Sequence, residues 1–189
     1  MTFIGFAVIF CLGALILWSI YTYNVFREKQ SLIDFWWDEV DAHLRFRRDL
    51  IPSLLDRARP LMKWESQVLD RIADIREKIV QNEIHSESAD LTESMERLEN
   101  SLSSEFHSLQ DAFREHTEIQ INLDLLTVMS ELASIEGKAL TACEEYNKLT
   151  NRYNSSIKSF PANLVVGMLH FNPREKRIFG KWKDTALET

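Results

Sequence analysis

The sequence predicts an all-α protein in which an N-terminal transmembrane helix is followed by an antiparallel four-helix bundle. Three observations lead to this fold class. The first 26 residues contain no Lys, Arg, Asp or Glu. Apolar residues then recur at alternating steps of three and four, which is the period of packed helices. The 189 residues include only 5 Gly and 4 Pro, which are too few turn residues for a β-sandwich.

Composition narrows the possible partners and cofactors. The formal net charge is -7, and an acidic balance disfavours nucleic acid as the main partner, because phosphate binding needs a basic face. An apolar fraction of 45% is enough to build a core. Two cysteines, Cys11 and Cys143, cannot form a disulfide framework and have no metal-binding spacing.

Residues 1–26 are predicted to be a single-pass membrane anchor. The apolar stretch FIGFAVIFCLGALILWSIYTY (3–23) would span about 31 Å as a helix, which matches a hydrocarbon core of ~30 Å. Trp18, Tyr21 and Tyr23 lie at its C-terminal end and Phe3 at its start, where rings can meet the headgroups. A cleavable signal peptide is the alternative, but the stretch lacks a basic start and a small-residue cleavage site. The first cations, Arg27 and Lys29, follow the stretch, so the positive-inside rule places the remainder in the cytoplasm.

Residues 27–161 are predicted to form the helical bundle. Pro52 and Pro60 interrupt the first run of apolar positions, so we expect one helix to end at about 50–58 and a second to cover about 60–82. A single long kinked helix is the alternative. A third helix is expected over roughly 89–118, with an acidic surface that could meet a basic partner, and a fourth ends near Phe160. The seam positions of the first run are Ile33, Trp37, Val40, Leu44, Ile51, Leu54, Ala58, Leu61, Val68, Ile72, Ile75 and Ile79. Those of the third helix are Leu91, Met95, Leu98, Leu102, Phe106, Leu109 and Phe113. Those of the fourth helix are Leu125, Val128, Leu132, Ile135, Ala139, Ala142, Tyr146, Leu149, Tyr153 and Ser156 or Ile157.

Two polar features fall on these predicted seams. Arg47 lies on the first seam and either sits at a helix end before Pro52 or makes a buried ion pair with a carboxylate of another helix, because an unpaired buried guanidinium would be costly. The pairs Tyr146-Asn147 and Tyr153-Asn154 are seven residues apart on the fourth helix. We interpret their rings as core residues with hydroxyls at the edge, and the asparagines as hydrogen-bonding groups. A ligand or partner site is the alternative.

Residues 162–189 form an apolar and then basic segment. Residues 171–183 carry five cations and one anion, interleaved with aromatic side chains. If four helices alternate in direction, this segment returns to the membrane side, where cations near an anionic leaflet bind favourably. The alternative is that the segment caps the open end of the bundle. The predicted membrane-surface residues are Phe171, Arg174, Lys176, Arg177, Phe179, Lys181, Trp182 and Lys183.

Two separated motifs resemble the LemA family of membrane-anchored bacterial proteins. The stretch ACEEYNKLTNRYNSSIKSFPANLVVGMLHFNPREKRIF (142–179) is similar to the C-terminal pattern of that family, and VDAHLRFRRDLIPSLL (40–55) is similar to its R-R-x-D-L-I-P run. Departures occur at Trp64-Glu65 and at Glu136-Gly137-Lys138, where the family commonly has His-Glu and E-N-R. The residues that match the family motifs are Arg47, Arg48, Asp49, Pro52, Tyr146, Asn147, Tyr153, Asn154, Phe160, Pro161 and Asn163.

The resemblance implies a LemA-like bundle behind one membrane helix in the inner (cytoplasmic) membrane. It implies no established catalytic residues and a loose link with membrane proteases of the HtpX type. The sequence itself shows no Glu-x-x-His, H-E-x-x-H, Walker or nucleophile-elbow motif, so we expect no enzyme activity, metal or cofactor. We expect a membrane-tethered scaffold that contacts the lipid bilayer and another membrane or membrane-associated protein. The alternative is an accessory or substrate-presenting subunit of a membrane enzyme.

Overall fold

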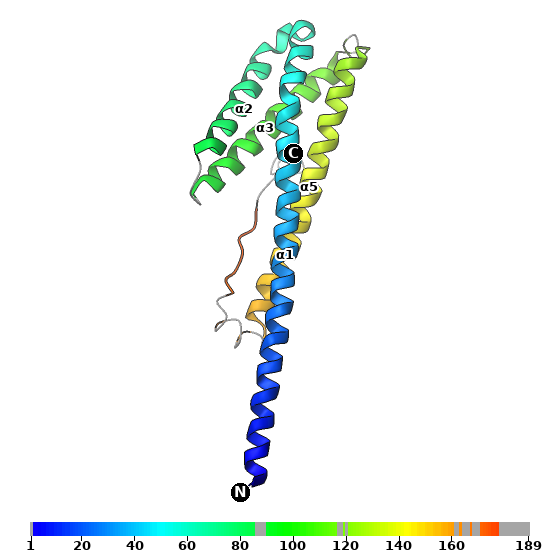
Figure 1. Ribbon diagram of the computed structural model, residues 1–189. Coiled ribbons are helices and arrows are strands. Elements are labelled where there is room, and N and C mark those ends of the chain that lie inside the picture. Colours follow the sequence, from blue (N-terminus) through cyan, green and yellow to red (C-terminus); the bar gives the residue numbers. More distant parts are fainter. Residues whose placement is uncertain are drawn as a thin grey trace, which may run out of the picture. The chain divides into compact units, whose positions relative to one another are not determined.

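The computed structural model describes residues 2–85, 90–116, 119, 121–160, 163, 167 and 171–177. Within these residues the regular structure is entirely helical, and no strand occurs. The prediction of an all-α protein is therefore confirmed. In chain order the elements are α1 (Thr2–Leu61), a short 3₁₀ helix (Lys63–Glu65), α2 (Ser66–His85), α3 (Asp90–Glu115) and α5 (Leu123–Lys158), as Figure 1 shows.

Helix α1 continues without a break through both prolines. It is 60 residues long and contains Pro52 and Pro60. The expected helix end at 50–58 is therefore a few residues too early, but two separate helices are observed as predicted, and the alternative of a single long kinked helix is wrong, because a short 3₁₀ helix lies between α1 and α2. The helix ends only at Leu61, and the amide of Met62 donates to the carbonyl of Ala58 at 2.7 Å. The second helix begins at Ser66 rather than at about 60.

The structure compensates for the hydrogen bond that Pro52 cannot make. A proline inside a helix has no N–H for the carbonyl four residues earlier, which here belongs to Arg48. The Nε of Arg76 on α2 donates to that carbonyl at 2.9 Å. A side chain from the second helix thus satisfies a backbone group of the first, and the proline creates a specific contact between them.

This contact predicts a coupled mutational effect. Arg76→Met is expected to lower the free energy of unfolding by about 1–3 kcal/mol, because it leaves the partly buried Arg48 carbonyl without a donor. In a Pro52→Ala background residue 52 regains an N–H that can donate to the same carbonyl, so we expect the loss to fall below about 1 kcal/mol. Urea unfolding of the four full-length chains in detergent micelles, followed by helical circular dichroism, measures both values. Equal losses in the two backgrounds would contradict the assignment.

The chain divides into two compact units. One comprises Met1–Trp37 with Glu144–Lys176, and the other comprises Asp38–Cys143 with the segment that starts at Arg177. Helices α1 and α5 contribute residues to both units.

The larger unit contains the main hydrophobic core. Helices α1, α2, α3 and α5 all contribute side chains to it, and α2 and α3 lie side by side (Figure 1). Most positions of the predicted seams are buried here, including Leu54, Ile79 and Leu109 at 0% exposure. The other fully or nearly fully buried members are Ile51, Ala58, Met62, Leu69, Ile72, Leu102, Leu125 and Leu132.

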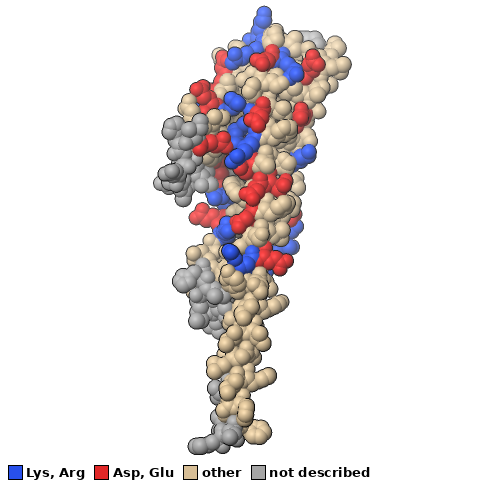
Figure 2. All heavy atoms as spheres, in the orientation of Figure 1, with Lys and Arg blue, Asp and Glu red and all other residues tan. Residues whose placement is uncertain are grey.

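The smaller unit contains the apolar start of α1 and a compact aromatic cluster. By length and composition α1 can cross a membrane: its best window has a mean hydropathy of 2.0 and only 6% of that window is buried. Phe3 is 90% exposed and Leu17 70% exposed. Figure 2 shows this N-terminal stretch without the blue and red spheres that mark charged side chains elsewhere. The stretch is compatible with the predicted anchor. The aromatic cluster has as its buried members Phe26, Ile33, Tyr146, Tyr153 and Phe171.

Candidate functional site

Two consecutive arginines of α1 lie inside the larger unit. Arg47 is 2% exposed and Arg48 4% exposed, although both are cations in a helix that is apolar on its core side. Taking a guanidinium out of water is unfavourable unless carboxylates and other acceptors surround it. The partners of these two side chains therefore determine whether the interior can hold them.

Arg47 is surrounded by acceptors from two other helices. Its Nη1 donates to Ser103 Oγ at 2.6 Å and to Glu136 Oε1 at 3.3 Å. Its Nη2 donates to a carboxylate oxygen of Glu99 and to the Glu99 carbonyl at 3.2 Å. The prediction of a buried ion pair is confirmed. The alternative position at a helix end is wrong, because α1 continues for 14 residues beyond Arg47.

Glu99 of α3 connects the two arginines. One of its carboxylate oxygens accepts from Arg47 and the other from Arg48, and Glu99 itself is 3% exposed. Arg48 also pairs with Glu83 on α2, which is 33% exposed. We call Arg47, Arg48, Glu83, Glu99 and Glu136 the charge cluster. It links α1 with α2, α3 and α5.

The positive and negative groups of the charge cluster nearly cancel and leave a formal net charge of one negative unit. Two guanidinium groups face three carboxylates, of which Glu83 is partly exposed. His107 of α3 lies beside the cluster, with Nε2 at 3.7 Å from Glu136 Oε2. Near neutrality suits a buried network, because any unpaired charge would carry its full desolvation penalty. The arrangement fixes which faces of four helices meet.

The carboxylates of the charge cluster were missed at the sequence level, although a signal was present. Glu99 and Glu136 directly follow the seam residues Leu98 and Ile135, and Ser103 follows Leu102. A helix that packs against several neighbours buries more than a strict two-position seam. Positions next to the seam are therefore interior too, and polar residues there indicate partners for a buried cation.

Asp49 and Pro52 of the first motif and the described residues of the SFP region lie at the surface. Asp49 and Pro52 are exposed on α1, and Phe160 is 79% exposed. Asn163 is exposed, and its amide donates to the carbonyl of Ser159 at 3.0 Å. Pro161 lies outside the described residues. The structure therefore assigns internal roles to the two arginines and a backbone role to Pro52.

The Tyr-Asn pairs of α5 belong to the smaller unit. Tyr146 is 5% exposed and Tyr153 1% exposed, as expected for core rings with hydroxyls at the edge. The Tyr153 hydroxyl accepts from Gln30 Nε2 at 2.8 Å, and its ring packs edge-on against Phe26. Burial raises the pKa of the Tyr153 phenol above its ordinary value of 10.0, while the Gln30 hydrogen bond acts in the opposite direction. The neutral hydroxyl fits this apolar environment.

The asparagine of the second pair binds the backbone of a distant segment. Asn154 Nδ2 donates to the carbonyl of Arg174 at 2.7 Å, and its Oδ1 accepts from the Arg174 amide at 2.9 Å. The Tyr146 hydroxyl donates to the carbonyl of Glu175 at 3.0 Å. Asn147, of the first pair, is half-buried on α5. The polar atoms of this motif thus hold the non-helical stretch 171–177.

The C-terminal segment lies partly on the protein itself. Phe171 is 8% exposed and contacts Tyr23, the last residue of the apolar stretch. This burial differs from the predicted headgroup contact, because the aromatic pocket of α1 covers the ring. Arg174 pairs with Asp34, and in the larger unit Arg177 pairs with Glu96. Lys176 is exposed. Its membrane contact and those of the other predicted basic residues stay predictions, and Phe179, Lys181, Trp182 and Lys183 lie outside the described residues.

The structure also shows how exposed the predicted anchor residues are and which carboxylates of the acidic helix α3 form ion pairs. Tyr21 is 68% exposed, Tyr23 40% exposed and Trp18 intermediate, and their contact with headgroups stays a prediction. On α3, the predicted acidic surface is partly used internally: besides Glu99 and Glu96, Glu105 pairs with Arg71 at 2.9 Å. Fewer carboxylates are therefore available to a basic partner than the sequence suggested.

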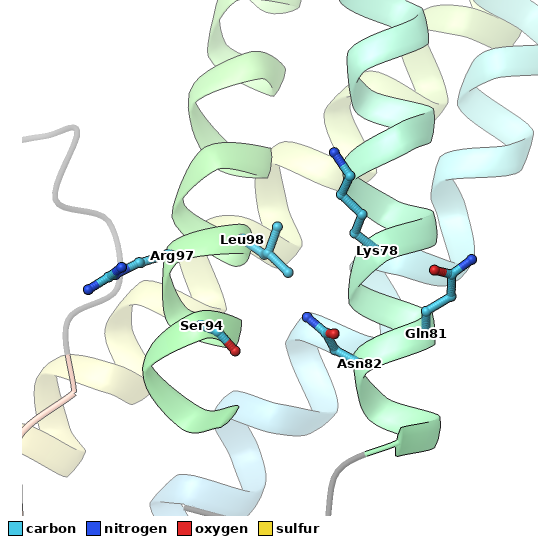
Figure 3. A pocket seen from close by; sticks show the side chains of 6 residues that line it. All are labelled: Lys78, Gln81, Asn82, Ser94, Arg97 and Leu98. Carbon is cyan, nitrogen blue, oxygen red and sulfur yellow. The ribbon is translucent and has the colours of Figure 1, made fainter. Parts of the chain in front are cut away.

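A hollow of about 390 Å³ lies between α2 and α3 (Figure 3). Asn82 and Ser94 flank it, and Leu98 contributes an apolar wall. Lys78, one of its cations, has its Nζ at 2.7 Å from Asp74 Oδ2, and Arg97 extends away from α2 in this view. The hollow is open and has no converging catalytic groups. Among the described residues no group of three or more His, Cys, Asp or Glu side chains could hold a metal ion.

The observations define an all-helical protein with one apolar N-terminal helix, a buried arginine–glutamate cluster and an asparagine-bound C-terminal stretch. A comparison with known families matches the LemA family over residues 36–185. Since this match covers well over half of the chain, the protein belongs to the LemA family. The matched range includes the charge cluster and both Tyr-Asn pairs and begins after the apolar stretch. A search of curated proteins gave no match.

Proposed function

We propose that this LemA-family protein is a membrane-tethered helical scaffold without catalytic activity. Residues 1–26 would anchor it as a single-pass helix in the inner (cytoplasmic) membrane of a bacterium. Residues 27–161 would form an antiparallel four-helix bundle on the cytoplasmic side. Its partners would be the lipid bilayer and another membrane or membrane-associated protein.

The observation that carries this proposal is the continuity of α1. One unbroken helix includes an apolar stretch long enough for a bilayer and, further along, buried residues of the main core such as Leu54 and Ala58. A single helix that carries both an apolar stretch and residues of the core is what a tether for an interaction module requires.

The interior chemistry supports a structural rather than a catalytic role. Enzyme sites place ionisable groups around a cleft where a substrate can reach them. In the charge cluster, Arg47, Arg48 and Glu99 are at least 96% buried and pair with each other or with other carboxylates. Their charges organise the helices.

The surface offers apolar side chains for a partner protein. Trp64, in the connection between α1 and α2, is 50% exposed and stacks near His116 at a ring-centroid distance of 4.6 Å. This contact brings the α1–α2 connection next to the end of α3. Ile121, in the connection that follows α3, is 77% exposed, and Leu123, the first residue of α5, is 74% exposed. Exposed aromatic and aliphatic side chains are candidates for contact with a partner protein.

Site-specific photo-crosslinking in intact membranes tests the proposal. We expect a crosslinker at Trp64 or Ile121 to capture a discrete protein, and one at Glu131, which is exposed on α5, to serve as the control position. Capture of a membrane enzyme that also co-purifies in stoichiometric amount in mild detergent would favour the accessory-subunit alternative. If no position on the bundle surface captures a protein, the scaffold proposal fails.

A further inference from the structure

In the smaller unit, side chains of α1 and α5 hold the protein's own residues 171–176, and we call the surface that receives this stretch the groove. The groove is formed by α1 and α5, and its occupant has no helical structure. The way in which the groove holds this stretch shows what kind of segment it can recognise.

The groove binds the occupant chiefly through its backbone. Asn154 donates to the carbonyl and accepts from the amide of the same residue, Arg174, at 2.7 and 2.9 Å. Tyr146 adds a hydrogen bond to the next carbonyl, at 3.0 Å. These groups are present in every peptide, so this part of the binding does not depend on sequence. Main-chain hydrogen bonds of this kind provide affinity in many peptide-binding domains, and side-chain pockets provide specificity.

Two side chains of the occupant are bound specifically. The Phe171 ring lies with its centroid 5.5 Å from that of Phe26 and 5.8 Å from that of Tyr23. Three residues later, the Arg174 guanidinium meets the Asp34 carboxylate through two contacts, at 2.9 and 3.4 Å. The side chains of Asn172, Pro173, Glu175 and Lys176 are exposed and unselected. The side-chain contacts of this stretch with the groove are therefore made by an aromatic residue and, three positions later, by an arginine.

The occupant makes few buried contacts. Phe171 is its one buried side chain within 171–176, and the Arg174–Asp34 pair is 38% and 52% exposed, so solvent screens it. These contacts are opposed by the conformational entropy that six backbone residues lose when they are held in place. A segment with few buried contacts can open locally without unfolding the remainder of the protein.

We propose that this groove is a docking site for an extended segment of a partner protein with the pattern aromatic-x-x-Arg, and that residues 171–176 occupy it until such a segment displaces them. Because Tyr23 ends the apolar stretch and forms one wall, the segment best placed to reach the groove is a juxtamembrane segment of a membrane protein. The inference rests on the proposed scaffold function and specifies one partner chemistry for it.

A peptide of the occupant's own sequence is the probe. The fluorescein-labelled peptide MLHFNPREKR (168–177) is titrated into four full-length chains in detergent, and anisotropy reports binding. We expect a chain with Phe171→Ala and Arg174→Ala, whose own segment is weakened, to bind the peptide at least about tenfold more tightly than the wild type, since a tethered competitor acts at an effective concentration near mM. Adding Asn154→Ala to that chain should weaken binding at least about tenfold. Asn151→Ala, on the exposed side of α5, is the matched control and should have no effect.

Several results would overturn the proposal. The first is that the peptide does not bind the chain with Phe171→Ala and Arg174→Ala. The second is that adding Asn154→Ala to that chain leaves the affinity unchanged. The third is that a peptide without the phenylalanine and the arginine binds as tightly as the original peptide. If the chain with Phe171→Ala and Arg174→Ala loses its helical circular dichroism, the wild-type chain is used instead, with an excess of peptide that carries a photo-crosslinker at the Phe171 position. Crosslinks to α1 around Tyr23 and Phe26 support displacement, and their absence overturns it. A negative peptide result together with protein capture at Trp64 or Ile121 would refute the groove and leave the scaffold function intact.

Discussion

Arg47→Met is expected to lower the free energy of unfolding by about 3–5 kcal/mol, which is a large part of the stability of a typical domain. The substitution keeps most of the side-chain volume but removes the cation that Glu136 and one oxygen of Glu99 face. Glu136 is 5% exposed at its side chain, so its charge would then be buried without the guanidinium that pairs with it. Chemical unfolding of the full-length chain in detergent micelles, monitored by helical ellipticity, measures the change.

Two further variants separate the buried network from a general charge effect. Arg45→Met removes a neighbouring arginine that is 65% exposed and pairs with Asp41 on the same helix, and it should change stability by no more than about 1 kcal/mol. Adding Glu136→Leu to Arg47→Met should recover part of the loss, because it removes one of the carboxylates left unpaired. Equal losses for Arg45→Met and Arg47→Met would show that the charge cluster does not stabilise the fold.

Leu12→Arg combined with Ile16→Arg is expected to abolish stable membrane insertion. Both side chains belong to the apolar stretch of α1 and are exposed, at 54% and 60%, where lipid would cover them under the proposed anchoring. An arginine near the centre of a membrane helix costs about 2.5–3.5 kcal/mol, so the two substitutions together cost roughly 5–7 kcal/mol. The fraction of protein that resists alkaline carbonate extraction from membranes measures the effect, and we expect it to fall from most of the protein to a small minority.

The matched control places the same two charges on the same helix beyond the apolar stretch. Ala42→Arg and Phe46→Arg change exposed positions of α1, and the double variant should stay in the membrane pellet. If both double variants are retained equally, the apolar stretch is not the anchor.

Periodicity predicted the helices well because it reflects burial directly. The seam positions Leu54, Ile79 and Leu109 are fully buried, and the third and fourth helices begin and end within a few residues of the expected bounds. The predicted break between the first two helices was placed a few residues too early, because α1 passes Pro52 and ends at Leu61, one residue after Pro60. Pro52 removes a donor from the helix, but Arg76 of another helix donates to the same carbonyl, so this proline does not end the helix.

The sequence by itself determined the helical class, the apolar start and the presence of a cation on a buried seam, because each depends on local composition and spacing. The tertiary structure decided which carboxylates neutralise Arg47 and Arg48, since Glu99 and Glu136 lie about 50 and 90 residues away and only folding brings them together. It also decided that Asn154 binds the backbone of residue 174 and that Phe171 faces an aromatic pocket. A non-helical segment that side chains hold in place has no periodicity of its own, so its position follows only from the surface that receives it.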